Sequence, residues 1–189
     1  MFPDGSLNIA SAWNKMTPWS LFCSFTGLSV VFSQTTFFNP EAIGGWKRDT
    51  ERYVDIVQGS FLMIPTALWR RLGGFHPRYF MYGEEADLCL RAAALGYRPM
   101  ITPDAQIMHL GGAAAPRAVR ILQLWRSKAT LVRGHWPSPL VPVGLCELWL
   151  CCATRRLASL AASKLSGRSN RDDVWREMWE KRNDWLQGY

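Results

Sequence analysis

Three carboxylates lie within four consecutive positions of the segment Tyr82–Tyr97, which reads YGEEADLCLRAAALGY. The composition from Glu84 onward predicts a helix whose first turn carries Glu84, Glu85 and Asp87. Because Asp87 and Arg91 are four residues apart, we expect an ion pair between them along one helix face, with Glu85 directed elsewhere. Carboxylates also favour a helix N-terminus through the macrodipole, and this simpler interpretation applies to many helices.

The loop before these carboxylates favours a chemical role for them. It reads GGFHPRYFMYG, and this glycine-rich, aromatic surrounding is unusual for carboxylates that only contact water. Mutual repulsion and aromatic cover raise the pKa of one carboxyl group toward the range of a general base. The segment is therefore a candidate for proton transfer at a substrate.

The composition predicts a globular protein with a substantial core. The chain has 189 residues, of which 48% are hydrophobic and 13% aromatic, enough for one domain with an appendage. A formal charge of +7 and ten tryptophans indicate a surface that meets an anionic and partly apolar partner, such as a membrane face, a diphosphate or a nucleic acid. Nucleic acid is the least favoured, because the basic residues are scattered and no recognised nucleic-acid module occurs.

We expect neither a secretory signal nor a membrane-spanning segment. The first ten residues include Asp4 and lack an apolar core, and the apolar stretches 19–32 and 139–153 are shorter than the roughly 18 to 20 residues of a spanning helix. The cysteines show neither CxxC spacing nor nearby histidines, which predicts reduced core residues in a cytoplasmic compartment. They are Cys23, Cys89, Cys146, Cys151 and Cys152.

The elements expected up to residue 115 are mixed α/β. A buried strand is predicted over Tyr53–Ile64, in which Gly59 marks a bulge or a close approach of the backbone to a ligand. Short helices are predicted from Pro18 to Gly27 and from Pro65 to Gly73, with a loop over Gln34–Thr50 between them. Two further short strands are expected around Pro103-Asp104.

The character of the chain changes at Ala115-Pro116. Beyond it, helices are predicted over Ala118–Val132, Leu140–Ser163 and Arg171–Leu186. We therefore divide the chain into a mixed α/β part, residues 1–115, and a helical C-terminal region, residues 116–189. The tryptophans of the last helix are expected to pack in a core or against a partner helix, with an interfacial amphipathic helix as the alternative. They are Trp175, Trp179 and Trp185.

Four ordered motifs resemble the acceptor-side half of family-2 glycosyltransferases, particularly bacterial rhamnosyltransferase-like and galactofuranosyltransferase-like enzymes. The motifs are a V-x-G strand at Val57–Gly59, GGF at Gly73–Phe75 followed by Phe80, the acidic helix start Glu84–Leu88 with Arg91, and His109-Leu110-Gly111-Gly112. The resemblance covers roughly Asp4–Ala115 and is most specific over Val54–Gly112.

This resemblance implies a partial GT-A-like fold and an inverting transfer of a sugar from a nucleotide donor to a glycan or lipid-linked acceptor. The implied setting is bacterial envelope or exopolysaccharide synthesis at the cytoplasmic face of the plasma membrane. The family's general base falls on Glu85, where the family usually has Asp. Glu84 and Asp87 are then expected to position the acceptor or support the helix turn, and Arg91 to hold Asp87 or contact substrate.

The resemblance assigns further residues outside the helix. Gln58 and Gly59 are candidates for the acceptor pocket, although a strand bulge explains the glycine equally well. His109 falls where related enzymes place a ligand to Mg²⁺ or Mn²⁺, which neutralises the departing diphosphate. His76 and His135 are expected to be surface residues.

The family's donor-binding half and its DxD metal motif have no counterpart in this sequence. We therefore expect a fragment, a mis-assigned start or a degenerate product, and no sugar-nucleotide turnover by the chain alone. The alternative function is a non-catalytic remnant that binds a glycolipid acceptor or a partner glycosyltransferase.

Basic residues next to the apolar run 140–152 predict peripheral membrane contact through a helix over Leu140–Ser163. They are Arg155, Arg156, Lys164 and Arg168. The alternative is that this helix packs on the rest of the protein and never meets lipid.

Overall fold

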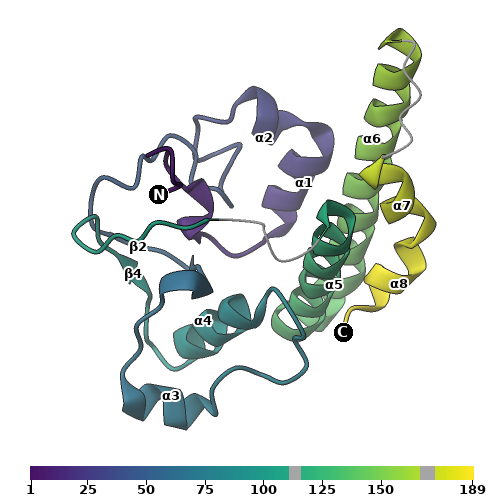
Figure 1. Cartoon of the computed structure of the whole chain (residues 1–189). Helices are drawn as coiled ribbons and strands as arrows, with labels where there is room; N and C mark the ends of the chain where they lie inside the picture. The colour runs from purple at the N-terminus through teal and green to yellow at the C-terminus, as the bar shows by residue number, and fades with distance from the viewer. Residues whose placement is uncertain (111–115, 167–172) are drawn as a thin grey trace.

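The computed structural model describes residues 1–110, 116–166 and 173–189 as a mixed α/β fold with few strands (Figure 1). The α-helices are α1 (Pro18–Thr26), α2 (Leu28–Val31), α3 (Thr66–Leu72), α4 (Glu84–Ala94), α5 (Arg117–His135), α6 (Val141–Ser166), α7 (Val174–Glu180) and α8 (Arg182–Gln187). The strands are β1 (Ala12–Trp13), β2 (Arg52–Tyr53), β3 (Ile56–Val57) and β4 (Met100–Ile101), with 3-10 helices η1 (Ile9–Ser11), η2 (Gly59–Phe61) and η3 (Ser138–Leu140).

The continuous strand predicted over Tyr53–Ile64 is wrong. This segment contributes to two separate antiparallel pairs, because Tyr53 pairs with Met100 while Ile56 pairs with Trp13. The chain changes partner between these positions and then turns into η2 at Gly59. The predicted burial holds only for Val54, Ile56 and Val57, whereas Tyr53, Phe61 and Met63 are exposed.

Of the two strands expected around Pro103-Asp104, only β4, before the turn, forms. No strand follows Pro103 in residues 103–110, the part of the predicted segment that the structure describes. Its backbone instead bonds to the N-terminal residue: the N–H of His109 donates to the carbonyl of Met1 at 2.8 Å, and the Met1 amino group donates to the carbonyl of Ile107 at 2.9 Å.

The predicted helices are present. Thr17 and Ser20 form a reciprocal capping box at the start of α1, and Gly27 ends it. The helix predicted from Pro65 begins at Thr66 and ends at Gly73. The last predicted helix is divided into α7 and α8 at Lys181, and its first two predicted residues, 171 and 172, lie outside the described part of the chain.

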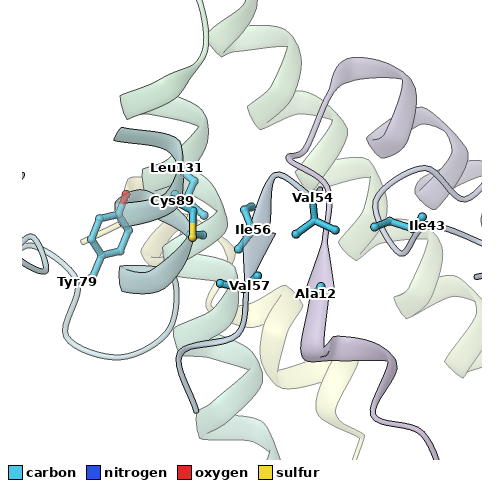
Figure 2. Close-up of a cluster of buried hydrophobic side chains, with 9 residues drawn as sticks. Ala12, Ile43, Val54, Ile56, Val57, Tyr79, Cys89 and Leu131 are labelled. Atoms are coloured by element: carbon cyan, nitrogen blue, oxygen red, sulfur yellow. The ribbon is translucent and has the colours of Figure 1, made fainter. Parts of the chain in front are cut away.

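One buried cluster joins the α/β part to α5. Figure 2 shows strand residues such as Ile56 and Val57 beside Cys89 of α4 and Leu131 of α5. The cluster consists of Ala12, Ile43, Val54, Ile56, Val57, Tyr79, Ala86, Cys89 and Leu131. Because α4 packs on both β3 and α5, the first turn of α4 has a buried position between the two parts of the chain.

A second cluster buries α1 against the C-terminal helices. Leu21 of α1 packs with Leu148 of α6 and Trp185 of α8, each no more than 1% exposed. Trp125 meets Trp185 edge-on at a centroid separation of 4.9 Å and Trp175 at 6.0 Å. Trp179 lies 5.2 Å from Trp149 between ring centroids. The expectation that the C-terminal tryptophans pack in a core is therefore confirmed.

All five cysteines are free, and four of them are buried. Cys146 is exposed, so its prediction as a core residue is wrong. It lies two residues before the buried Leu148, which places it on the opposite side of α6. Within the described ranges, none of the helices combines the length and the hydropathy needed to cross a bilayer.

Candidate active site

A left-handed turn positions the start of α4. Tyr82 and Gly83 have φ values of 67° and 87°, so two successive residues bend the backbone immediately before Glu84. A Cβ atom on Gly83 would lie 2.8 Å from the Cβ of Ser127 in α5. Only glycine lets the turn approach α5 this closely.

Glu85 is buried against the backbone of Gly59. Its residue exposure is 9%, and its Cβ lies 3.4 Å from the position a Cβ on Gly59 would take. The backbone at Gly59 thus lies close to Glu85, and its approach to a ligand stays a prediction. Burial, reinforced by the charge of Glu84, raises the pKa of the Glu85 carboxyl, against backbone hydrogen bonds that lower it. Among the described residues, its Oε2 has no hydrogen-bond partner.

The pKa of Asp87 is shifted in the opposite direction, below its ordinary value. The predicted pair with Arg91 is present, with 2.6 Å between Nε and Oδ2, and Nε2 of His135 lies 2.8 Å from Oδ1. Burial favours the neutral carboxyl, but the hydrogen bonds from His135 and Arg91 outweigh it and hold the pKa of Asp87 below its ordinary value.

His135 corrects the expectation of a surface residue. It belongs to the last turn of α5, and its side chain is only 21% exposed because it reaches across to Asp87 in α4. Arg91 also donates to the carbonyls of Leu72 and Gly74, at 2.7 and 2.8 Å, which ties α4 to the end of α3. The guanidinium therefore serves three protein acceptors at once.

A cavity of about 930 Å³ adjoins this turn. Glu85, Gln58 and His135 line it, together with residues of α1, α2 and α5. Gln58 is held by Asn8, whose amide nitrogen donates to the Gln58 side-chain oxygen at 3.0 Å. Lys128, which also lines the cavity, is paired with Glu41 at 3.0 Å. Gly59, Glu84, Asp87 and Arg91 do not line it.

His109 lies elsewhere. It lines a second, mainly apolar cavity of about 790 Å³, which shares Gln58 with the first cavity but not Glu85. Over residues 1–110, 116–166 and 173–189, no three His, Cys, Asp or Glu side chains come together as a metal site. His109 alone does not make a metal centre, and Gly111-Gly112 of its motif lie outside the described residues.

Several residues around the turn gave no signal in the sequence. His135 and Lys128 are 48 and 87 residues away from their partners Asp87 and Glu41. The C-terminal Tyr189 donates its hydroxyl to the carbonyl of Met81 at 2.5 Å, 108 residues away. Helical spacing finds partners only within one helix, so these contacts follow from the fold.

Comparison with known proteins gives partial relatives. The chain is 37% identical over 97 residues to the N-acetylglucosaminyl-diphospho-decaprenol L-rhamnosyltransferase of Mycobacterium tuberculosis. This match covers 48% of this chain and 32% of the relative. It is 37% identical over 60 residues to the rhamnosyltransferase WbbL of Escherichia coli K12, covering 32% of this chain and 23% of the relative. The matched parts thus span a third or less of the curated relatives.

No family model matches the chain, and no solved structure matches it significantly. The similarity to the two rhamnosyltransferases nevertheless agrees with the four motifs in the sequence. The predicted resemblance is confirmed: this chain is a rhamnosyltransferase-like partial sequence.

Proposed function

We propose that the chain is the acceptor-side part of an inverting family-2 glycosyltransferase with a GT-A fold, and that Glu85 is its general base. The observation that carries this proposal is a buried carboxylate at the wall of a cavity, with a raised pKa and one oxygen without a hydrogen-bond partner. A raised pKa increases the basicity of the carboxylate, so it accepts a proton more readily from a hydroxyl group in the cavity.

In the proposed reaction, the Glu85 carboxylate accepts the proton of an acceptor hydroxyl. The acceptor oxygen forms a bond to the anomeric carbon of the donor sugar. The bond from that carbon to the nucleoside diphosphate breaks on the opposite face, and the diphosphate leaves with the electron pair. The configuration at the anomeric carbon is therefore inverted.

The neighbouring residues divide the remaining tasks. Asp87 is a positioning residue, because Arg91 and His135 lock it in place and it does not line the cavity. Gln58 is oriented by Asn8 at the cavity wall, which suits a hydrogen bond to an acceptor sugar. Gly59 contributes a backbone hydrogen bond to the Glu85 carboxylate.

The relatives' names supply the substrate class. One is named for decaprenol-linked N-acetylglucosaminyl diphosphate and L-rhamnose. By analogy, we assign this chain a lipid-linked sugar diphosphate acceptor and a nucleotide-activated rhamnose donor, in cell-envelope glycan synthesis at the cytoplasmic membrane face. His109 is assigned as one ligand of a divalent metal, whose other ligands would come from beyond the described residues.

A polypeptide that joins this chain to a donor-binding half tests the assignment of Glu85. Glu85→Gln keeps the size of the side chain but removes proton acceptance, so turnover falls by about 10² to 10⁴. Acceptor binding, measured by calorimetry, stays near the wild-type value. Glu84→Gln is the matched control, since Glu84 does not line the cavity, and it retains most of the turnover.

Two results would contradict the proposal. Near wild-type turnover by Glu85→Gln would remove Glu85 as the base and leave Glu84 or Asp87 as candidates. Acceptor binding without transfer, in the joined polypeptide and in the chain alone, would favour a non-catalytic module that binds a glycolipid or a partner glycosyltransferase. The chain alone is expected to show no turnover.

A further inference from the structure

The segment from Met16 to Pro40 contains no charged residue and no histidine. In a chain with 20% charged residues, 25 uncharged positions in succession mark a distinct surface. Its aromatic side chains contact one another across α1, α2 and the following turns, with centroid separations of 5.0 Å for Trp19–Phe37 and 4.8 Å for Phe32–Phe38. We call the exposed side of this segment the aromatic face.

The aromatic face is open to solvent. Val30 and Val31 are 76% and 74% exposed, and Phe37 is 64% exposed. Trp19, Phe22 and Phe32 are each about two-fifths exposed. Isolated apolar residues on a surface are ordinary, but a contiguous set of this kind marks an interaction site.

Three polar side chains of the segment that carries the aromatic face are paired within it. The indole Nε1 of Trp19 donates to the carbonyl of Phe37 at 2.6 Å. The hydroxyl of Thr35 donates to the carbonyl of Phe32, and the amide of Asn39 to that of Ser33, both at 3.0 Å. Such internal pairing lowers the cost of moving the segment into an apolar medium.

The far part of α6 also carries exposed apolar residues. Arg155 donates to the hydroxyl of Ser24 at 3.1 Å, which places it at the end of α1. Beyond Arg155, α6 extends with Leu157 64% exposed and Leu165 90% exposed, beside Lys164. Figure 1 shows α2 and this end of α6 both toward the top of the molecule.

The expectation that the arginines of α6 contact anionic headgroups needs correction. Arg155 is held by Ser24 and the carbonyl of Cys151, and Arg156 is paired with Asp173 at 2.5 Å. Both guanidinium groups therefore already serve protein acceptors, and Arg168 lies outside the described residues. Membrane contact must rest mainly on the aromatic face rather than on these arginines.

The helices that carry the aromatic face also line the cavity of Glu85. Ser20 and Ser24 of α1 and Ser29 of α2 contribute to its wall, as does the exposed Lys15 just before α1. The same two helices therefore carry the aromatic face and form part of the wall of the Glu85 cavity. Lys15 directly precedes this uncharged segment and is a basic group that complements anionic headgroups.

We propose that the aromatic face docks on the surface of an anionic phospholipid bilayer and holds the Glu85 cavity next to the membrane, where a lipid-linked acceptor enters. The link to the acceptor rests on the proposed function, whereas the docking itself does not. Tryptophan and phenylalanine favour the boundary between headgroups and acyl chains, which distinguishes this surface from an ordinary charged protein surface.

Vesicle flotation with the full chain tests the docking. The chain is expected to float with vesicles of phosphatidylcholine and phosphatidylglycerol, and more weakly with phosphatidylcholine alone. The double variant Val30→Glu/Val31→Glu should lower the partition coefficient about tenfold or more, because two apolar side chains no longer enter the bilayer. Val119→Glu is the control, since Val119 is 42% exposed and belongs to α5 rather than to the segment that carries the face, and it should bind as the wild type does.

Circular dichroism and an unchanged unfolding midpoint establish that the variants fold. Flotation of the folded wild type with neither vesicle, or equal flotation of Val30→Glu/Val31→Glu, overturns the docking. Concentration-dependent self-association that disappears in this variant, without vesicle binding, would make the face a protein interface instead. Glu85→Gln should float normally, so a failure of the catalytic proposal is distinguishable from a failure of docking.

Discussion

The candidate site gives neighbouring carboxylates different properties through their surroundings. Glu85 and Asp87 lie in the same first turn of α4, so the helix dipole acts on both. Glu85 is buried beside Gly59 and keeps one unpartnered oxygen, and its pKa is raised mainly by this burial. Asp87 faces two hydrogen-bond donors from other positions, and its pKa is lowered. One turn thus holds a candidate base beside a fixed anion.

Replacing Asp87 tests whether its negative charge stabilises the folded protein. Asp87→Asn removes the charge that pairs with Arg91 and His135, so the free energy of unfolding at pH 7 should fall by about 2 to 3 kcal/mol, as for other buried pairs that lose one partner. Asp184→Asn is the control, because its pair with Arg126 is exposed and should contribute about 0.5 kcal/mol or less. Urea unfolding measures both.

The stability difference between the wild type and Asp87→Asn should depend on pH, because the pKa of Asp87 is lowered in the folded state. A depressed carboxyl pKa stabilises the folded state above the pKa of the unfolded chain, about 3.9, and this stabilisation is lost as the pH falls through the folded-state value. The stability gap between wild type and Asp87→Asn should therefore be full at pH 6 and shrink below about pH 4. A gap that widens on acidification would contradict this assignment.

Within the site, sequence reasoning succeeded where partners share an element. The Asp87–Arg91 pair was predictable because four residues of helix bring the two side chains together. The Asp87–His135 contact was not, because it depends on how α5 crosses α4. Lys128 was missed for the same reason, since its partner Glu41 lies in a loop of the α/β part.

At the scale of elements, the helices were predictable from local signals and the strands were not. Thr17-Pro18 caps α1 and Gly73 ends α3, and both features act within a few residues. The strands are only two residues long, so their existence depends on a partner such as β4, 47 positions beyond β2. The apolar run Tyr53–Ile64 therefore indicated neither the course of the backbone nor which of its side chains are buried.

Two glycines flank α4 and can be compared, Gly83 before the helix and Gly96 after it. Gly83 and Gly96 share a φ of 87°, so alanine at either should cost about 1 kcal/mol for the left-handed backbone. A Cβ on Gly83 meets Ser127 of α5 at 2.8 Å, whereas a Cβ on Gly96 meets nothing within 4 Å. Gly83→Ala should therefore lower the free energy of unfolding by a further 1 to 3 kcal/mol or so, as overpacked cores do.

Chemical denaturation of the two variants measures this difference. Gly83→Ala should also reduce any transfer activity of the joined polypeptide, because the clash with α5 displaces the first turn of α4, while Gly96→Ala should leave activity near wild type. Equal stability of Gly83→Ala and Gly96→Ala would mean that the turn does not depend on its approach to α5.

Considered as a whole molecule, the chain links its two ends around the candidate site. α1, near the N-terminus, makes its most extensive helix contact with α6. The C-terminal Tyr189 donates its hydroxyl to the carbonyl of Met81, next to the acidic turn. Its ring and that of Tyr79 make a T-shaped contact. The division into residues 1–115 and 116–189 stays a prediction, but these contacts favour cooperative folding of both parts.

A cavity-forming change in α1 tests that cooperativity. Leu21 is 1% exposed and packs with residues of α6, α7 and α8, so Leu21→Ala should lower the free energy of unfolding by about 2 to 4 kcal/mol. If both parts unfold together, hydrogen exchange of the amides of α6 should accelerate as much as that of α1. Leu165→Ala is the control, because that side chain is 90% exposed and its loss should change exchange in neither helix. Faster exchange in α1 alone would show that the C-terminal helices fold independently.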